Sequence, residues 1–218
     1  MENSTIAAVA TPNAPGGIGI VRISGSRAIE TAAAVFTPIG GSPLTECKGY
    51  HARFGTVHDG EERLDEAVCL VFRAPRSYTG EDVVEISCHG GIYITKRVLR
   101  AVLNAGAVPA EAGEFTKRAF LNGKIDLAGS ESVMALISAS GKQAASAALN
   151  TLEGRLSGEI RSCADKLTAV CASLAAWVDY PDDDIEEIGG GEMLPVFKDV
   201  KAAPVSYTHL TLPTNREV

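Results

Sequence analysis

The sequence is short of aromatic residues, paired cysteines and long apolar runs. Aromatic residues make up 6% of its 218 positions, and its five cysteines are an odd number with no Cys-x-x-Cys pair. No secretory leader is recognisable, so we expect reduced thiols and a cytoplasmic protein. No apolar run approaches the roughly 20 residues that a membrane-spanning helix requires, which predicts that the chain does not cross a membrane.

Positive charge is also in deficit. The formal net charge is −7 at pH 7, which argues against a protein that wraps nucleic acid through bulk charge. Any contact with RNA is therefore expected to be local or to be made by a partner. With 45% hydrophobic and 22% charged residues, the chain has ordinary globular composition and can bury a core.

The first half of the chain changes its apolar periodicity often, as mixed α+β domains do. Short or alternating apolar runs predict strands at residues 5–10, 19–23, 51–57, 66–72 and 83–88. Apolar residues at helical spacing predict helices at 26–36 and 91–105. We therefore predict an α+β domain over residues 1–120.

The second half has a purely helical pattern and is predicted to form an all-α segment over residues 121–203. Helices rich in Ala and Leu are expected at 130–140 and 142–179, with a short restart at 192–201. The apolar stripe of the long helix at 142–179 requires partner helices, and the rest of the chain supplies almost none.

Two stretches near the C-terminus are interpreted as having no functional site. Residues 182–187 form an acidic run that we read as a solvated face, because a metal site needs more widely spaced ligands. Residues 204–218 differ in character from everything before them. We expect these residues to extend neither the preceding helix nor the helical domain, and to be a non-native tail.

Three segments resemble common functional motifs without satisfying them. The glycines of residues 16–22 lead into a strand, whereas a dinucleotide fingerprint places them between a strand and a helix. Residues 140–143 read Ser-Gly-Lys-Gln and lack the first glycine and the Ser or Thr of a P-loop. Cys88 and His89 are adjacent on a strand and point to opposite faces, which excludes a cysteine–histidine pair. No catalytic residue and no metal ligand is predicted.

Two charged residues on predicted strands are candidate ligand-binding groups. Arg22 follows the apolar run Ile-Gly-Ile-Val and either points inward to an acceptor or lies outward on a half-exposed strand. Glu85 lies on a strand whose other face is wholly apolar, where a carboxylate can accept two parallel hydrogen bonds from a guanidine-like ring edge, such as that of a pterin. The alternative for Glu85 is an ordinary edge-strand glutamate. The glycines after His89 would let a ligand approach the backbone, while His89 itself is expected to cap or pack.

Residues 112–127 combine charged, apolar and turn residues in an order that helix patterning does not require. Apolar side chains at helical spacing are expected to anchor a helix while charged ones point elsewhere: Phe115, Ala119 and Phe120 against Glu114, Lys117 and Arg118. Asn122-Gly123 predicts a helix stop with a left-handed turn. Lys124 follows this turn and is either a holder of a carboxylate or phosphate or a solvated loop lysine.

Six segments, in order along the chain, resemble the MnmE (TrmE) family of tRNA-modification GTPases. They read TIAAVATP at residues 5–12, GGIGIVRISG at 16–25, YTGEDVVE at 78–85, HGG at 89–91, GEFTKRAFLNGK at 113–124 and YPDDD at 180–184. The run Gly-Glu-Phe-x-x-Arg-Ala-Phe-Leu-Asn is highly specific to that family. The resemblance extends from Thr5 to about Lys201.

This resemblance implies a fold and a cofactor. Members of the family have an α+β N-terminal domain that resembles the folate-binding module of aminomethyltransferases, mediates homodimerisation, and binds 5-formyl- or 5,10-methylene-tetrahydrofolate. By resemblance, Arg22, Glu85 and Lys124 occupy the positions of the family's folate contacts. Glu85 is expected at the pterin edge, and the two cations on the charged or polar remainder of the cofactor.

The resemblance also implies partners and a larger protein. With the flavoprotein MnmG (GidA), the family installs a carboxymethylaminomethyl-type group at C5 of the tRNA wobble uridine, and a G domain hydrolyses GTP with magnesium and potassium. The present sequence is expected to be a fragment that stops before that G domain, so it would bind folate and dimerise without hydrolysing GTP. The alternatives are a free-standing folate-dependent transferase, for which the sequence shows no evident acid or base, and a non-catalytic dimerisation scaffold.

Overall fold

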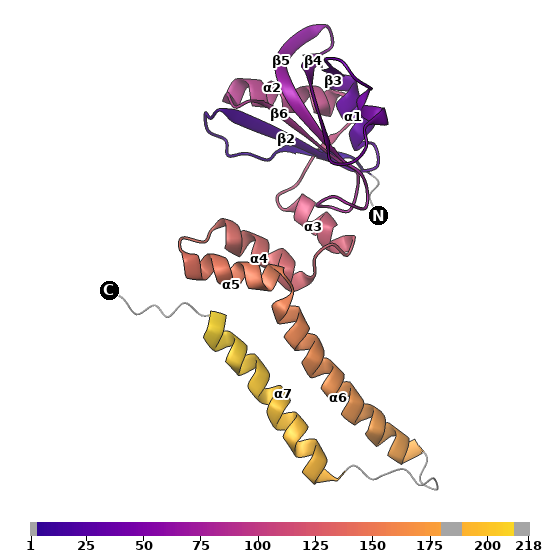
Figure 1. Cartoon of the computed structure of the whole chain (residues 1–218), viewed down its shortest axis with the longest axis vertical. Helices are drawn as coiled ribbons and strands as arrows, with labels where there is room; N and C mark the ends of the chain where they lie inside the picture. The colour runs from indigo at the N-terminus through magenta and orange to yellow at the C-terminus, as the bar shows by residue number, and fades with distance from the viewer. Residues whose placement is uncertain (1–3, 180–188, 212–218) are drawn as a thin grey trace, which may run out of the picture. The chain divides into compact units, whose positions relative to one another are not determined.

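The computed structural model describes residues 4–179 and 189–211, with side chains described as far as residue 203. The chain divides into two compact units, residues 1–124 and 125–218 (Figure 1). The acidic run at 182–187 and the YPDDD segment lie outside the described residues, so the interpretation of the acidic run stays a prediction.

The first unit is built on one seven-stranded sheet with the order β3-β4-β5-β6-β2-β1-β7. Neighbouring strands run antiparallel except β1 and β7, which are parallel. The strands are β1 (Ile6–Val9), β2 (Ile18–Ser24), β3 (Phe36–Pro38), β4 (His51–Asp59), β5 (Glu62–Phe72), β6 (Val83–His89) and β7 (Val108–Pro109). All five predicted strands are confirmed, and β3 and β7 are additional because such short strands show no period in a sequence.

One face of the sheet forms the core with helices α1 (Ala28–Val35) and α2 (Ile92–Asn104) (Figure 1). Alternate strand residues point to this face and are fully buried: Val21, Ile23, Cys69, Val71, Val84 and Ile86. Val98, Ala101 and Val102 of α2 pack against them at the spacing of one helical face. The predicted α+β arrangement is thus confirmed, including both helices.

The opposite face of the sheet is left partly exposed. Cross-strand partners form a row over it that consists of Ala52, Leu70, Glu85, Arg22 and Ala8. On the same face, Phe54 and Val68 are paired across β4 and β5, and their residues are 52% and 42% exposed. Ile18, at the start of β2, is 64% exposed. We call this surface, defined by Arg22, Glu85, Phe54, Val68 and Ile18, the open face.

Helix α3 (Glu114–Leu121) closes the first unit and ends in the left-handed turn that the sequence predicts. Gly123 has φ +68°. Its amide donates to the carbonyl of Phe120 over 3.0 Å, and the amide of Lys124 donates to that of Ala119 over 2.8 Å. This pair of bonds is a Schellman motif, and it fixes the backbone of Lys124 at the end of the helix.

The second unit is all-α, as predicted. Its helices are α4 (Leu127–Ile137), α5 (Lys142–Leu152), α6 (Arg155–Asp179) and α7 (Gly190–Thr211). The prediction of one helix over 142–179 is wrong, because Gly154 adopts φ +83° and separates α5 from α6. A left-handed residue cannot continue a right-handed helix.

Helix α7 is longer than the restart predicted at 192–201. It continues through Pro204 to Thr211, so the expectation that residues after 203 extend no helix is wrong. α7 packs against α6, with an ion pair between Lys166 and Asp199, and so supplies a partner for the long helix. Within the described residues, no helix combines the length and apolar character needed to span a membrane.

Candidate functional site

Arg22 and Glu85, the two strand residues singled out in the sequence, form an ion pair on the open face. They are direct cross-strand partners on β2 and β6, and Arg22 Nε donates to Glu85 Oε1 over 2.8 Å. Their side chains are 30% and 19% exposed. Because β6 lies between β5 and β2, the alternative of an edge-strand glutamate is wrong.

Two aromatic rings flank the guanidinium of Arg22. Its Cζ atom lies 5.7 Å from the ring centroid of Tyr78 and 5.6 Å from that of Phe115. Tyr78 belongs to the loop before β6, and Phe115 lies on the first turn of α3. Both distances are within the range of cation–π attraction, which stabilises a cation on a ring face and limits its motion.

The pair leaves polar atoms available to a ligand. Among the described residues, Arg22 makes no hydrogen bond through its two terminal nitrogens, and Glu85 accepts only from Arg22 Nε. Glu85 therefore keeps its second oxygen and one lone pair of the first, while Arg22 keeps two amino groups. A ligand at this site meets a fixed donor and a fixed acceptor side by side.

Lys124 lies next to the loop that carries Tyr78. Its Nζ atom donates to the carbonyl of Pro75 over 3.2 Å, and its side chain lies against Gly80. No hydrogen bond or ion pair joins Lys124 to Arg22 or Glu85 among the described residues. The structure thus pairs two of the three predicted residues directly, and the third, at the end of α3, lies with its side chain against the loop that carries Tyr78.

Arg118 is buried, which the sequence pattern does not predict. Its residue is 8% exposed. Of the three expected anchors, Ala119 is fully buried but Phe120 is 40% exposed, so the expectation for Phe120 is wrong. The guanidinium donates to Glu114 Oε1 over 2.9 Å, to both carboxylate oxygens of Glu81 over 3.2 Å, and to the carbonyl of Ser4 over 2.8 Å. The expectation that Arg118 points away from the structure is wrong, because two carboxylates and a carbonyl compensate its charge.

Glu114 is held in its ionised form by the same cluster. Burial opposes ionisation, but hydrogen bonds from the Glu111 amide and the Arg118 guanidinium outweigh it and hold the pKa of Glu114 below its ordinary value. The carboxylate thus stays charged opposite Arg118 over most of the accessible pH range.

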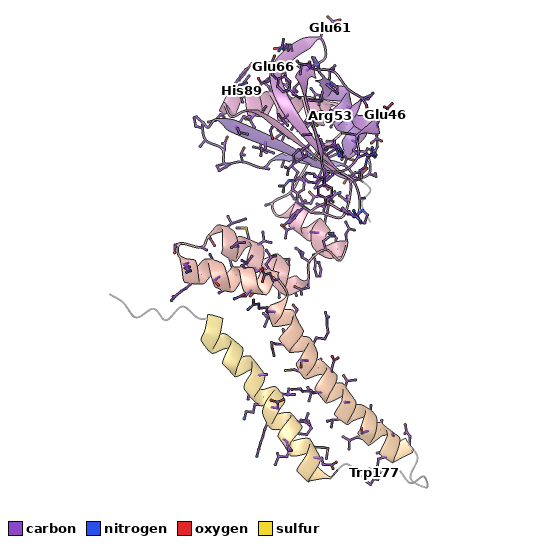
Figure 2. All side chains as sticks on the ribbon, viewed as in Figure 1. Glu46, Arg53, Glu61, Glu66, His89 and Trp177 are labelled. Atoms are coloured by element: carbon purple, nitrogen blue, oxygen red, sulfur yellow. The ribbon has the colours of Figure 1, made fainter. Side chains whose placement is uncertain are left out.

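A second polar pair lies at the far end of the same strand. His89 shares the open face with Glu85, because the two residues are separated by an even number of positions on β6. Asp65 accepts hydrogen bonds over 2.7 Å from the His89 backbone amide and from ring Nδ1. Burial raises the pKa of Asp65, but these bonds outweigh it and the net shift is downward. The side chain of His89 is 75% exposed (Figure 2).

His89 is thus neither a cap nor a packing residue, contrary to the sequence interpretation. Cys88 is buried on the other side of the sheet, as expected, and burial raises the pKa of its thiol. The following glycine, Gly90, lines the cavity described below and also lets the loop before β2 lie close to the end of β6. A Cβ on Gly90 would lie 2.5 Å from the carbonyl oxygen of Gly16, so Gly90 is needed for contact with the loop before β2.

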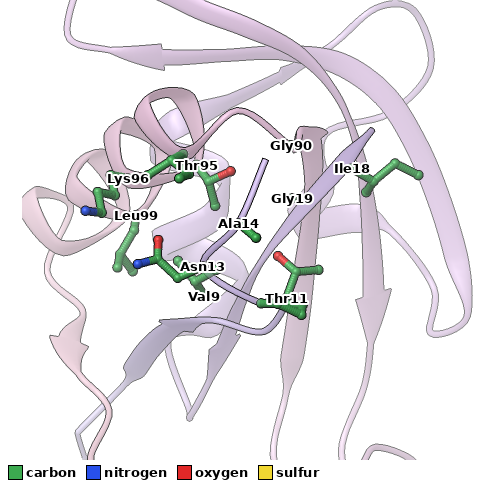
Figure 3. Close-up of a pocket in the computed structure, with 12 residues that line it drawn as sticks. Val9, Thr11, Asn13, Ala14, Ile18, Gly19, Gly90, Thr95, Lys96 and Leu99 are labelled. Atoms are coloured by element: carbon green, nitrogen blue, oxygen red, sulfur yellow. The ribbon is translucent and has the colours of Figure 1, made fainter. Parts of the chain in front are cut away.

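A cavity of about 280 Å³ lies elsewhere in the first unit. It is formed by the loop between β1 and β2 and by the first turns of α2, and Figure 3 shows Lys96, Thr95, Asn13 and Thr11 on its walls. It includes none of the three predicted site residues. Among the described residues there is also no cluster of three or more His, Cys, Asp or Glu side chains that could hold a metal ion.

Comparison with known families covers both units. Residues 5–124 match the profile of the GTP-binding protein TrmE N-terminus, and residues 127–207 match that of the MnmE helical domain. The chain belongs to the MnmE (TrmE) family. The two matched regions agree with the two compact units, a mixed sheet domain followed by helices.

Curated members of the MnmE family are close in sequence to this chain. It is 49% identical over 185 residues to the tRNA modification GTPase MnmE of Moorella thermoacetica, which covers 84% of the chain. The proteins of the same name from Symbiobacterium thermophilum and Clostridioides difficile are 47% and 45% identical over 85% of it. The chain spans only 40% or 41% of the length of these relatives.

The structure adds residues that the motifs did not assign to the site. Tyr78 and Phe115 lie inside segments that carry the family resemblance. Their spacing in the sequence does not indicate that both rings contact the guanidinium of Arg22. Asp65 lies outside those segments altogether. Strand register and loop packing bring these side chains to Arg22 or His89. A local pattern of charged residues next to glycine therefore does not indicate them.

Proposed function

We propose that the first unit binds a tetrahydrofolate one-carbon donor at Arg22, Glu85 and Lys124. The observation that carries this proposal is the Arg22–Glu85 pair, a 2.8 Å contact on the partly exposed sheet face with two aromatic rings against the Arg22 guanidinium. A pterin presents a planar ring with a guanidine-like edge and needs an aligned carboxylate and adjacent apolar surface. The residues present fit these requirements.

Each residue has a distinct part in this proposal. Glu85 accepts two parallel hydrogen bonds from the pterin edge through the oxygen positions that Arg22 leaves available. The terminal nitrogens of Arg22 and the ammonium of Lys124 hold the polar or anionic remainder of the cofactor. The bound cofactor, in the 5-formyl or 5,10-methylene form, supplies the one-carbon unit, and these side chains bind and orient it.

We extend the proposal to the activity of the longer proteins that this chain matches. These relatives carry the name tRNA modification GTPase. The chain would act with the flavoprotein MnmG to place a carboxymethylaminomethyl-type group on C5 of the tRNA wobble uridine in the cytoplasm. GTP hydrolysis with magnesium and potassium would belong to a G domain, for which the described residues provide no P-loop. With its net charge of −7, this chain would reach tRNA through the complex.

Homodimerisation through the first unit is the remaining part of the proposal. The open face exposes the apolar side chains of Phe54, Val68 and Ile18 beside the proposed site. Phe54 and Val68 are cross-strand neighbours, and exposed apolar side chains that adjoin each other are typical of protein–protein contact. We propose a second copy of the chain as the occupant, in accord with the resemblance.

Binding of 5-formyl-tetrahydrofolate, measured by calorimetry, tests the proposed site. Glu85→Gln should weaken binding about 10- to 100-fold, because a hydrogen bond to a charged group contributes about 1.5–3 kcal/mol. Glu61→Gln, an exposed glutamate on the β4–β5 turn, is the matched control and should bind like the unmodified chain. Absence of binding, or equal binding by Glu85→Gln, would reject the site and favour a non-catalytic scaffold.

A free-standing folate-dependent transferase is the second candidate, and one observation favours it. The hydrogen-bonded Asp65–His89 pair is an oriented imidazole on the face that carries Glu85, and so provides the acid or base that the sequence did not reveal. Transfer of a one-carbon unit by the chain alone, lost in His89→Asn and reduced in Asp65→Asn, would support this candidate. Binding without any transfer would leave the first proposal.

A further inference from the structure

Arg118 is the most extensively bonded charged side chain near the proposed site, yet it does not reach the open face. Its side chain is 9% exposed, and its three nitrogens donate to groups on three separate segments of the first unit. Glu114 lies on α3, Glu81 in the loop before β6, and Ser4 in the segment before β1. A lysine, with one nitrogen, could not serve these positions together.

The contacts around Arg118 fasten α3 to the loop at residues 77–82. The hydroxyl groups of Tyr78 and Thr116 are hydrogen-bonded over 2.9 Å, and Asn122 Nδ2 donates to the carbonyl of Thr79 over 2.7 Å. Together with Arg118–Glu81, these bonds join the loop to Thr116 and Arg118 within the helix and to Asn122 at its C-cap. Three side-chain contacts therefore join the two segments that carry Tyr78 and Phe115.

The same cluster reaches the strand that carries Arg22. Ser24 donates to Glu81 Oε2 over 2.7 Å and is hydrogen-bonded to Thr79 over 2.7 Å. Ser24 is two positions from Arg22 on β2, and so lies on the same side of the strand. Arg118, Glu81 and Ser24 thus connect α3 and the loop to the strand at the level of the guanidinium.

We infer that Arg118 is a positioning residue for the proposed folate site: it locks α3 and the 77–82 loop onto β2 so that the rings of Phe115 and Tyr78 stay against the Arg22 guanidinium. The inference rests on the proposed function for its ligand but concerns an arrangement that exists without ligand. Loss of Arg118 should release the rings and let the Arg22 side chain sample other rotamers. The terminal nitrogens of Arg22 would then no longer be presented beside Glu85.

The arrangement itself can be measured in the full chain without ligand. The Nε–H group of Arg22 lies near two ring faces and donates to Glu85, so its NMR signal should carry a ring-current shift and exchange slowly with water. In Arg118→Lys and Arg118→Met this signal should move toward the position of an exposed arginine. Arg63→Met, which removes an exposed arginine paired with Glu66, is the matched control and should leave the Arg22 signal in place.

Binding gives the second readout. Arg118→Lys should weaken the affinity for 5-formyl-tetrahydrofolate about tenfold, by analogy with other losses of preorganisation. A purely structural role would lower the melting temperature in step with affinity, whereas a positioning role shows an affinity loss in variants that remain fully folded at the assay temperature. If Arg118→Met does not fold, Glu81→Gln weakens the same link with a smaller charge change and is measured in its place.

The outcomes separate this inference from the proposed function. An Arg22 Nε–H signal that stays unchanged in the folded Arg118 and Glu81 variants overturns the positioning role. A signal that moves as expected, in a chain that binds no 5-formyl-tetrahydrofolate at all, keeps the positioning role and rejects the folate site. If the Arg22 Nε–H signal moves and the affinity for 5-formyl-tetrahydrofolate falls, both the positioning role and the folate site are supported.

Discussion

The carboxylate of Glu114 ties the stability of the first unit to pH. Its pKa lies below the ordinary value of 4.5, despite partial burial, because the Glu111 amide and Arg118 favour the charged form. A carboxyl group with a lowered pKa in the folded state stabilises that state above its unfolded pKa and loses this contribution as the pH falls through the folded value. The pKa of Asp65, ordinarily 3.8, is lowered as well and acts in the same direction.

We therefore expect the free energy of unfolding to fall as the pH drops below about 4.5, and this dependence should be weaker in Glu114→Gln. Urea unfolding, followed through amide NMR signals of β6 at several pH values between about 6 and 3, measures it. The variant should be less stable than the unmodified chain at pH 6 and approach it at the acidic end. A parallel pH dependence in both proteins would show that Glu114 is not the responsible group.

For single residues, the sequence identified the charged side chains that are candidates for binding but not the side chains that they contact. Arg22 and Glu85 could each be selected as a charged residue in an apolar strand, because burial of a charge demands compensation. That they compensate each other depends on the β2–β6 register, which no local pattern records. The prediction for Arg118 is wrong because helical spacing places charged residues on the exposed side of a helix. Such a pattern does not indicate when a charged side chain is buried together with two carboxylates.

The turn from β6 into α2 shows how one glycine joins two elements. The Gly16 amide donates to the Gly90 carbonyl over 3.0 Å, and a Cβ at position 90 would lie 2.7 Å from the Ile18 nitrogen. The neighbouring atoms belong to backbone, so they cannot rotate away as a side chain would. Gly90 therefore lets the loop before β2 lie directly on the end of β6.

Gly90→Ala should destabilise the first unit by about 1–3 kcal/mol, as overpacking of a close contact does. Gly91→Ala is the control, since a Cβ there meets nothing within 4 Å and the backbone has φ −70°. Thermal unfolding followed by near-ultraviolet circular dichroism should show a lower midpoint for the first variant alone. Equal midpoints would mean that the loop moves away at little cost.

The elements with strong periodicity were predictable, and those bounded by a single residue were not. The strands of the sheet and α2 carry repeated apolar side chains, and their positions follow from the sequence. The break between α5 and α6 depends on Gly154 alone, inside a stretch that is otherwise rich in helix-forming residues. A helix tolerates an isolated glycine, so the sequence alone does not show whether Gly154 lies within one continuous helix or ends it.

The open face has consequences for the molecule as a whole. Its apolar residues are exposed within this chain, although burying them would be favourable. If a second copy covers them, Phe54→Glu or Val68→Glu should convert a dimer to a monomer. Burial of an unpaired carboxylate costs several kcal/mol, so the dissociation constant should rise by about two orders of magnitude or more.

Light scattering coupled to size-exclusion chromatography measures this change in mass. Tyr93→Glu is the control, because Tyr93 is 67% exposed and lies on α2, which covers the opposite side of the sheet from the open face. A dimer that persists in both open-face variants would place the interface elsewhere. A monomer in the unmodified chain would reject the proposed dimer.

The sequence by itself determined the class of each unit, the family, and the charged residues that are candidates for binding. These follow from periodicity and from local motifs, which depend only on neighbours along the chain. The tertiary structure decided that Arg22 lies against Glu85, that the rings of Tyr78 and Phe115 lie against its guanidinium, and that Arg118 is buried. These contacts join residues far apart in the chain, so strand register and the packing of α3 fix them, and no local pattern encodes either.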